Sequence, residues 1–303
     1  MSRYAAHAAA ALLPLALTAL APMAQADSPA PSPGMHTDIE YGKADGESLK
    51  LDASVPSGEG SFPVVILVHG GGWGSGDKEG DMAPILGPLL TPGFTWFTIN
   101  YRMAPAHRWP ACQEDVVTAL RWIKKHAAEY KGDPKRVALI GYSAGGQLAT
   151  LAAVQARRGD VVQAVVGLAA PTDMEADTAR RGGLSKSLQD LFGRTTTAVD
   201  PEALKWMQEM STIRHLRRGL PPFLLVHGTA DKSVPYSQSI NLQAKLKELG
   251  TPCDLITLPE APHAIAKWAT SDATYPAAIV AWLTKTLGSA TTSPVSESGA
   301  ITR

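Results

Sequence analysis

The chain has 303 residues, of which 45% are hydrophobic and 18% charged, and its formal net charge is +0. This composition is typical of a globular protein with one large core, and it excludes a fibrous or low-complexity chain. The pI of about 7.1 gives no sign of a surface suited to nucleic acid or to an anionic membrane. We therefore expect a neutral or weakly charged small substrate and no nucleic-acid partner.

The N-terminus has the pattern of an export signal. Arg3 precedes an apolar run over residues 5–24, and Ala24-Gln25-Ala26 supplies the small-x-small pattern that signal peptidase reads. The alternative is a membrane anchor, but the densest apolar stretch, residues 8–20, is shorter than a spanning helix and contains Pro14. We expect a signal peptide over residues 1–26, cleaved after Ala26, and a periplasmic or secreted protein with no stable membrane association.

Strands and helices then alternate along the chain, after a Pro/Ser-rich linker over residues 27–34. In chain order we expect an edge hairpin over 35–55, strands over 64–68 and 94–99, a helix over 111–130, a strand over 136–140, a helix over 144–155, strands over 161–168 and 223–226, a helix over 237–249, a strand over 254–258 and a helix over 274–286. This alternation predicts an α/β fold, with a mostly parallel sheet covered by helices on both faces.

One segment interrupts the alternation. Residues 171–219 are too long for an ordinary connection and too apolar for a solvated loop, so we expect a cap-like insert over the active-site face of a catalytic domain spanning 35–287. Residues 288–303 are rich in Ser and Thr, which predicts a disordered tail. Cys112 and Cys253 fall on elements expected to lie far apart, so two separate buried thiols are expected, and no Cys/His spacing indicates a metal site.

Residues 141–145 read GYSAG and fit the G-x-S-x-G nucleophile elbow. They follow an expected strand and open an expected helix, the context in which a sharp turn presents a serine hydroxyl above the sheet. The alternative is an ordinary Gly/Ser loop, which would need no such flanking elements. The pattern predicts Ser143 as a nucleophile.

Residues 69–73 read HGGGW and directly follow a buried strand. Three glycines let main-chain N–H groups face a ligand, and acyl transfer needs such donors for its oxyanion. We expect the N–H groups of Gly71, Gly72 and Ala144 to form this oxyanion hole. A phosphate loop would carry a lysine directly after the glycines, which is absent here. Trp73 either lines the substrate pocket or packs under the loop.

A serine hydroxyl needs a base, and chain position selects one histidine. Asp231 and His263 lie in loops after the last two expected strands, which gives the chain order Ser, Asp, His that accompanies the nucleophile elbow. The alternatives are a turn-forming role for Asp231 and a surface-loop role for His263. His69 and His227 end buried strands, so we interpret them as structural. Arg102 and Asp115 are expected to form a buried bracing pair.

Taken together, these motifs resemble the hormone-sensitive-lipase-related α/β-hydrolases, and most closely the exported bacterial carbohydrate esterases (feruloyl and acetyl-xylan esterases). The segments that carry the resemblance are residues 69–73, residues 100–102 (NYR), residues 141–146 (GYSAGG) and the Asp231 and His263 loops. The family's usual Ser-Pro on the cap side reads Ser211-Thr212 here. The resemblance implies the α/β-hydrolase fold and the same three oxyanion donors.

The leading hypothesis is a serine carboxylic-ester hydrolase that works through an acyl-serine intermediate without a cofactor. The resemblance implies removal of acetyl or feruloyl groups from plant cell-wall polysaccharide or related small esters. The alternatives are an arylformamidase-like amide hydrolase, which shares the His-Gly-Gly-x-Trp pattern, and a ligand-binding pseudo-hydrolase. No feature of the sequence indicates an oligomeric state.

Overall fold

The computed structural model describes residues 34–80, 82–90, 93–289 and 291. The expected signal peptide (residues 1–26), the expected linker up to residue 33 and residues 292–303 of the expected tail lie outside the described residues. Gly34 belongs to the first strand rather than to the linker. Near the other end, Thr291 pairs with Ser61, and the carbonyl of Ser289 accepts a hydrogen bond from Arg136, so this part of the expected tail contacts the domain.

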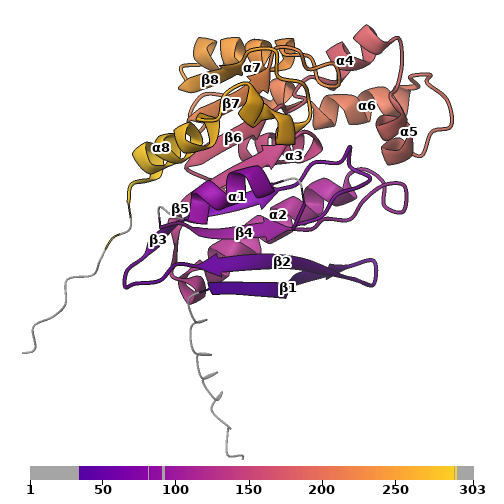
Figure 1. The fold of residues 1–303 in the computed structure, drawn as a ribbon. Coiled ribbons are helices and arrows are strands. Elements are labelled where there is room, and N and C mark those ends of the chain that lie inside the picture. The colour runs from indigo at the N-terminus through magenta and orange to yellow at the C-terminus, as the bar shows by residue number, and fades with distance from the viewer. Residues whose placement is uncertain (1–33, 81, 91–92, 290, 292–303) are drawn as a thin grey trace, which may run out of the picture.

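An eight-stranded sheet runs through the molecule in the order β1-β2-β4-β3-β5-β6-β7-β8 (Figure 1). The strands are β1 (Gly34–Ala44), β2 (Glu47–Val55), β3 (Phe62–Val68), β4 (Thr95–Ile99), β5 (Gly132–Tyr142), β6 (Ala164–Leu168), β7 (Phe223–Gly228) and β8 (Cys253–Leu258). The pairs β1–β2 and β2–β4 are antiparallel, and all other pairs are parallel. The expected edge hairpin and mostly parallel sheet are confirmed.

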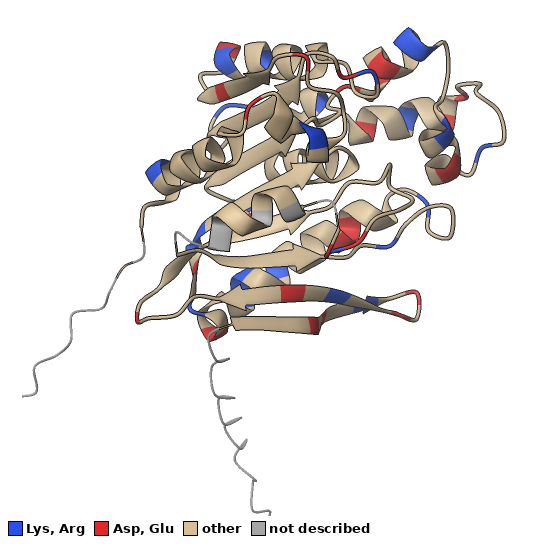
Figure 2. Ribbon diagram, viewed as in Figure 1, with Lys and Arg blue, Asp and Glu red and all other residues tan. Residues whose placement is uncertain are grey.

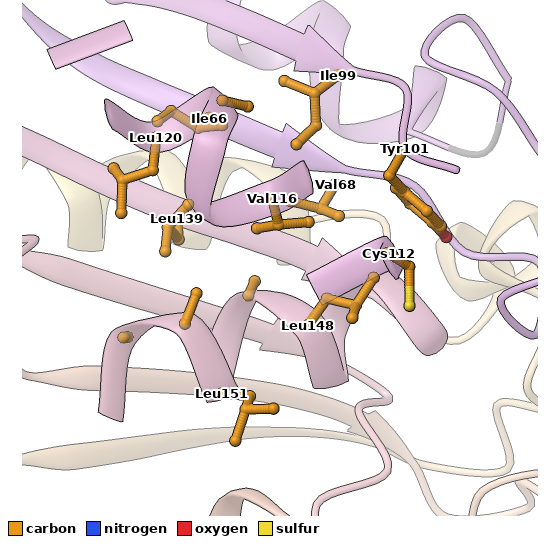
Figure 3. Packing of buried hydrophobic residues seen from close by; sticks show 14 of the residues in the cluster. Ile66, Val68, Ile99, Tyr101, Cys112, Val116, Leu120, Leu139, Leu148 and Leu151 are labelled. Atoms are coloured by element: carbon orange, nitrogen blue, oxygen red, sulfur yellow. The ribbon is translucent and has the colours of Figure 1, made fainter. Parts of the chain in front are cut away.

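Helices cover both faces of the sheet, and each face has its own core. On one face lie α2 (Ala111–His126), α3 (Ala144–Val154) and α7 (Ser237–Glu248), and on the other lie α1 (Ala83–Leu90) and α8 (Tyr275–Leu287). A 3-10 turn, η1 (Ala127–Tyr130), extends α2. Figure 3 shows the first core, in which strand residues meet the apolar faces of α2 and α3; the labelled examples include Ile66, Val68, Leu139, Val116, Leu120, Leu148 and Leu151.

Several elements differ from the predicted ones. Helix α1 was not expected, because Gly87 and Pro88 interrupt its sequence and both disfavour helix; buried Ile85 holds it in the core. Strand β5 begins at Gly132 rather than at residue 136. Strand β6 begins at Ala164 rather than at residue 161. Just before it, Gln163 pairs with Val137 through its main-chain N–H, which donates to the carbonyl of Val137 at 2.8 Å, and through its side-chain oxygen, which accepts the N–H of Val137 at 2.9 Å.

The two cysteines are free and buried, as expected. Burial raises the pKa of the Cys112 thiol and of the Cys253 thiol to about 12, so almost no thiolate exists at pH 8. We predict that a disulfide reagent such as DTNB at pH 8 modifies neither thiol in the native protein and both after denaturation in guanidinium. Rapid titration of either thiol in the native protein would contradict this burial.

The expected insert, residues 171–219, contains three helices and a 3-10 turn: α4 (Met174–Arg181), α5 (Lys186–Phe192), α6 (Pro201–Met210) and η2 (Thr212–His215). Side chains of Asp173, Ser185 and Asp200 cap the three helices at their N-termini. Figure 2 shows that charges of both signs lie on these and the other outer helices and loops, while the central strands carry few. None of the described helices is long and apolar enough to cross a membrane.

Candidate active site

Ser143 lies at the junction between β5 and α3. Its backbone has φ 53° and ψ −120°, a conformation that a non-glycine residue keeps only when its surroundings hold it. A Cβ on Gly141 would lie 2.1 Å from the carbonyl oxygen of Gly145, and a Cβ on Gly145 would lie 2.2 Å from that of Val68. The glycines are therefore required by close backbone packing, and the turn is the sharp strand-to-helix elbow that the sequence predicts.

Three side chains from three loops form a continuous hydrogen-bonded row. Ser143 Oγ lies 2.9 Å from His263 Nε2, and His263 Nδ1 lies 2.7 Å from Asp231 Oδ2. Asp231 follows β7 and His263 follows β8, so all three residues lie beyond the carboxyl ends of parallel strands. Because a carboxylate only accepts hydrogen bonds, Nδ1 carries the proton and Nε2 is left to accept from the serine hydroxyl. In this geometry an imidazole can remove the serine proton.

Asp231 has a full set of donors. Its Oδ1 accepts the main-chain N–H groups of Ser233 and Val234 at 2.8 and 2.9 Å, and its Oδ2 lies 3.3 Å from Nε2 of His227. Burial alone would raise the pKa of Asp231, but hydrogen bonds from His227 and His263 lower that pKa well below its ordinary value. Asp231 is therefore a carboxylate across the range in which histidines titrate.

His227 is a second histidine on the same carboxylate oxygen, which the sequence analysis interpreted as structural only. Its Nε2 is also 3.0 Å from the carbonyl oxygen of Val234, so this nitrogen carries the proton. Its Nδ1 lies 2.8 Å from Ser239 Oγ on α7, which donates to it. The spacing of four residues between His227 and Asp231 was the only sequence signal for this contact.

Tyr142 was also missed as part of the site. Its hydroxyl donates to the main-chain oxygen of His263 at 2.7 Å, and the two rings stack with centroids 5.4 Å apart. The residue before the nucleophile thus holds the loop that carries the base. In the G-x-S-x-G pattern this position is unspecified, so the motif itself gave no indication of the role.

The glycine loop after β3 adopts the conformation that only glycine accepts easily. Gly71 has φ 103° and Gly72 has φ 60°, and a Cβ on Gly71 would lie 1.9 Å from the carbonyl oxygen of Ser75. Gly71, Gly72 and Ala144 line the same cavity as Ser143. Within the part of the chain that the structure describes, no carbonyl or side chain accepts a hydrogen bond from these three N–H groups. They are available to an oxyanion.

Trp73 both lines the pocket and packs under the glycine loop, the two roles between which the sequence did not decide. It lines the cavity that contains Ser143, although only 6% of its surface is exposed. Its side chain also packs inward, and its indole N–H donates to Gln147 Oε1 at 2.9 Å. The residue is therefore a wall of the pocket and a support of the glycine loop.

The cavity has a volume of about 620 Å³, and the insert forms one side of it. Seven of its lining residues come from the insert: Pro171, Met174, Asp177, Arg181, Ser185, Ser187 and Leu188. Arg181 of α4 also donates to the carbonyl of Ser233, in the loop that carries Asp231. The insert is thus joined to the acid loop and shapes the space in front of Ser143.

The remaining sequence candidates lie outside this row. Arg102 and Asp115 form the expected buried pair, with Nε and Nη2 of Arg102 2.9 and 2.8 Å from the carboxylate. His69 stacks on Tyr101 with ring centroids 4.3 Å apart. In the described segments, no group of three or more His, Cys, Asp or Glu side chains could hold a metal ion.

The chain is similar to a known family of hydrolases and to several curated esterases. The BD-FAE family model matches residues 51–246. The probable carboxylic ester hydrolase LipM of Mycobacterium tuberculosis is 31% identical over 68% of this chain and 50% of its own length. The esterase LipQ of the same organism is 31% identical over 75% of this chain and 56% of its own length. The chain spans about half the length of these curated relatives.

Solved structures share the fold. A truncated form of a carbohydrate esterase from gut microbiota has a TM-score of 0.72 and 25% identity, covering 86% of this chain and 98% of that one. An acetyl ester-xyloside bifunctional hydrolase from Caldicellulosiruptor lactoaceticus has a TM-score of 0.70 and 21% identity, covering 84% and 97%. With the family model spanning β3 to β7, Ser143 and Asp231, the chain belongs to the BD-FAE family and has the α/β-hydrolase fold.

Proposed function

We propose that this protein is a serine carboxylic-ester hydrolase that works through an acyl-serine intermediate. The observation that carries the proposal is the row Ser143–His263–Asp231, with distances of 2.9 and 2.7 Å, beside three available main-chain N–H groups. Support also comes from relatives named as ester hydrolases. No step of the mechanism requires a cofactor.

The proposed reaction has two halves. His263 Nε2 takes the proton of Ser143 Oγ as the oxygen attacks the ester carbonyl, and the N–H groups of Gly71, Gly72 and Ala144 stabilise the negative oxygen. His263 returns the proton to the leaving alcohol, which departs and leaves Ser143 acylated. Water then attacks the acyl group with His263 as base, and the acid and free Ser143 are released.

The cavity favours a small acyl group on a hydroxyl-rich alcohol. Its walls carry the hydroxyl groups of Ser75, Ser185 and Ser187 and the charged side chains of Asp177 and Lys232, which suit a sugar better than a long acyl chain. The likeness to a carbohydrate esterase points in the same direction. The proposed substrates are acetyl or feruloyl esters of plant cell-wall polysaccharide or related small esters.

The proposed test measures acid release from acetylated xylan and from methyl ferulate, with the Ser143→Ala variant as the blank. Release that vanishes in the variant supports the esterase and identifies its acyl group. No release, together with covalent labelling of Ser143 by a fluorophosphonate, would discard the cell-wall substrate. Cleavage of an N-formyl arylamine instead would favour the amide-hydrolase alternative, and neither turnover nor labelling would favour the pseudo-hydrolase.

We expect kcat/KM to fall in a single step as the pH is lowered. Asp231 remains ionised, because its pKa is lowered by hydrogen bonds from His227 and His263 that outweigh the opposing effect of burial. Loss of activity on the acid side is therefore expected from the base of the row rather than from Asp231, since an imidazolium cannot act as base. We predict that kcat/KM falls on the acid side and levels off at higher pH. A profile that is flat from about pH 5 to 9 would contradict His263 as the base.

We also propose that the protein is exported. Support comes from the apolar run over residues 5–24 and from Ala24-Gln25-Ala26. Intact mass measurement of the protein recovered from cell fractions tests this. A mature chain that begins at Asp27, outside the cytoplasm, is the expected result, and a full-length cytoplasmic chain would contradict export.

A further inference from the structure

Gln147 is a buried polar residue that the reaction above does not use. It lies on α3, and its main-chain N–H donates to the carbonyl oxygen of Ser143 at 3.0 Å, so it follows the nucleophile by one helical turn. None of its surface is exposed. A side-chain amide in such a position is kept only when both of its ends are hydrogen-bonded.

Both ends of this amide have partners, and the partners fix its orientation. The indole N–H of Trp73 is a donor only, so Oε1 of Gln147 faces it, at 2.9 Å. The carbonyl oxygen of Met210 is an acceptor only, so Nε2 of Gln147 faces it, also at 2.9 Å. One side chain therefore joins the glycine loop to the end of α6.

The Trp73 end of this bridge is the residue that follows Gly71 and Gly72. Trp73 has φ 60°, a conformation that a bulky side chain keeps only when its surroundings hold it. Its carbonyl oxygen accepts the N–H of Ala104 at 2.8 Å, and its indole is held by Gln147. The bond to Gln147 ties the glycine loop directly to the helix that begins at the nucleophile.

The Met210 end of the bridge is anchored in the insert. Ser211 Oγ donates to the carbonyl oxygen of Met207 in α6 at 2.7 Å and accepts the N–H of Met174 at 2.9 Å, at the start of α4. Met174 lines the cavity in front of Ser143. The position of the insert and the position of the glycine loop are therefore linked through the amide of Gln147.

We infer that Gln147 is a positioning residue: by holding Trp73, it sets the oxyanion N–H groups of Gly71 and Gly72 against Ser143. Through its bond to Met210, it also couples the glycine loop to the insert. The inference rests on the proposed ester hydrolysis at Ser143. Its physical basis is that oxyanion donors act only when they are held at hydrogen-bond distance from the developing charge. A shift of about 1 Å in such groups costs about 100-fold in rate.

The test is a double-mutant cycle on kcat and KM for p-nitrophenyl acetate. Gln147→Met keeps the length of the side chain and removes both hydrogen bonds, and Trp73→Phe removes the indole N–H together with the five-membered ring that carries it. Each variant should lower kcat by about 10- to 100-fold with a smaller change in KM. The double variant should be no slower than the slower single variant, because both changes break the same contact.

Thr150→Val is the matched control. Thr150 Oγ1 donates to the main-chain oxygen of Gln147 at 3.1 Å and lies 2.9 Å from Thr212 Oγ1. It therefore joins the same helix to the insert, but neither contact involves the glycine loop or the side-chain amide of Gln147. This variant should lower the Tm and keep the wild-type kcat. A loss of kcat equal to that of Gln147→Met would mean that attachment of the insert, rather than the bond to Trp73, controls the rate, and would overturn the inference.

Four further outcomes decide whether the inference stands. A wild-type kcat in Gln147→Met, or a double variant whose loss is the product of the single losses, would overturn the inference while leaving the esterase intact. If Gln147→Met does not fold, a wild-type kcat in Trp73→Phe overturns it alone. Absence of both turnover and Ser143 phosphonylation in the wild-type protein would instead overturn ester hydrolysis, and this inference with it.

Discussion

Replacement of Ser143 by alanine should lower kcat by about six orders of magnitude, to a residual rate that comes from binding and the oxyanion donors. The variant removes only Oγ, the atom 2.9 Å from His263 Nε2, and it keeps the Cβ that the elbow already accommodates. We therefore expect its Tm to stay close to that of the wild-type protein. Initial rates with p-nitrophenyl acetate, corrected for uncatalysed hydrolysis, and thermal unfolding measure the two effects.

Ser48→Ala is the control for this change. Ser48 donates to Glu40 on the edge hairpin, far along the sheet order from the β5–α3 junction, and its loss should leave kcat unaltered. Turnover by Ser143→Ala above a few per cent of the wild-type rate would exclude Ser143 as the nucleophile. A large fall in Tm would instead mean that the hydroxyl supports the fold.

Replacement of Asp231 by asparagine should lower kcat by about four orders of magnitude, the loss seen when the acid of such a triad becomes an amide. Asparagine can still accept the N–H groups of Ser233 and Val234 through one oxygen, so the loop keeps its shape. Its NH₂ group then faces His263 Nδ1, which must accept rather than donate. The proton moves to Nε2, and the imidazole can no longer take the proton of Ser143.

The same assay measures Asp231→Asn, with Asp160→Asn as the control, because the carboxylate of Asp160 pairs with the exposed side chain of Arg121 and does not line the cavity. The histidine tautomer can be read directly from the ¹⁵N chemical shifts of the His263 ring. A variant that keeps near wild-type kcat would contradict the role of Asp231, and so would a ring whose proton stays on Nδ1.

The sheet and the row of reacting groups could be predicted because their signals are local. Strand β3 is a continuous apolar run, which indicates burial on both faces, and the elbow glycines are adjacent to Ser143 in sequence. Asp231 and His263 follow β7 and β8. These two strands are consecutive in the chain and are also neighbours at one edge of the sheet. Parallel strands bring such loops to one edge without any knowledge of side-chain packing.

Other features could not be predicted because they depend on contacts between distant segments. Gln147 meets Trp73 and Met210, which are 74 and 63 residues away, and nothing in the helix pattern indicates either partner. Helix α1 forms against α8 despite Gly87 and Pro88, so packing overrides a local preference. The roles of His227 and Tyr142 likewise depend on where their polar atoms point, which no periodicity encodes.

The most direct test of the account is covalent labelling of the native protein by a fluorophosphonate, followed by peptide mapping. The reagent reacts only with a serine whose proton is removed by a base and whose attached phosphoryl oxygen is stabilised by the oxyanion donors. We predict one label per chain, on Ser143, with labelling strongly slowed in His263→Ala. Labelling of another residue, or none in a folded protein, would contradict Ser143 as the activated nucleophile.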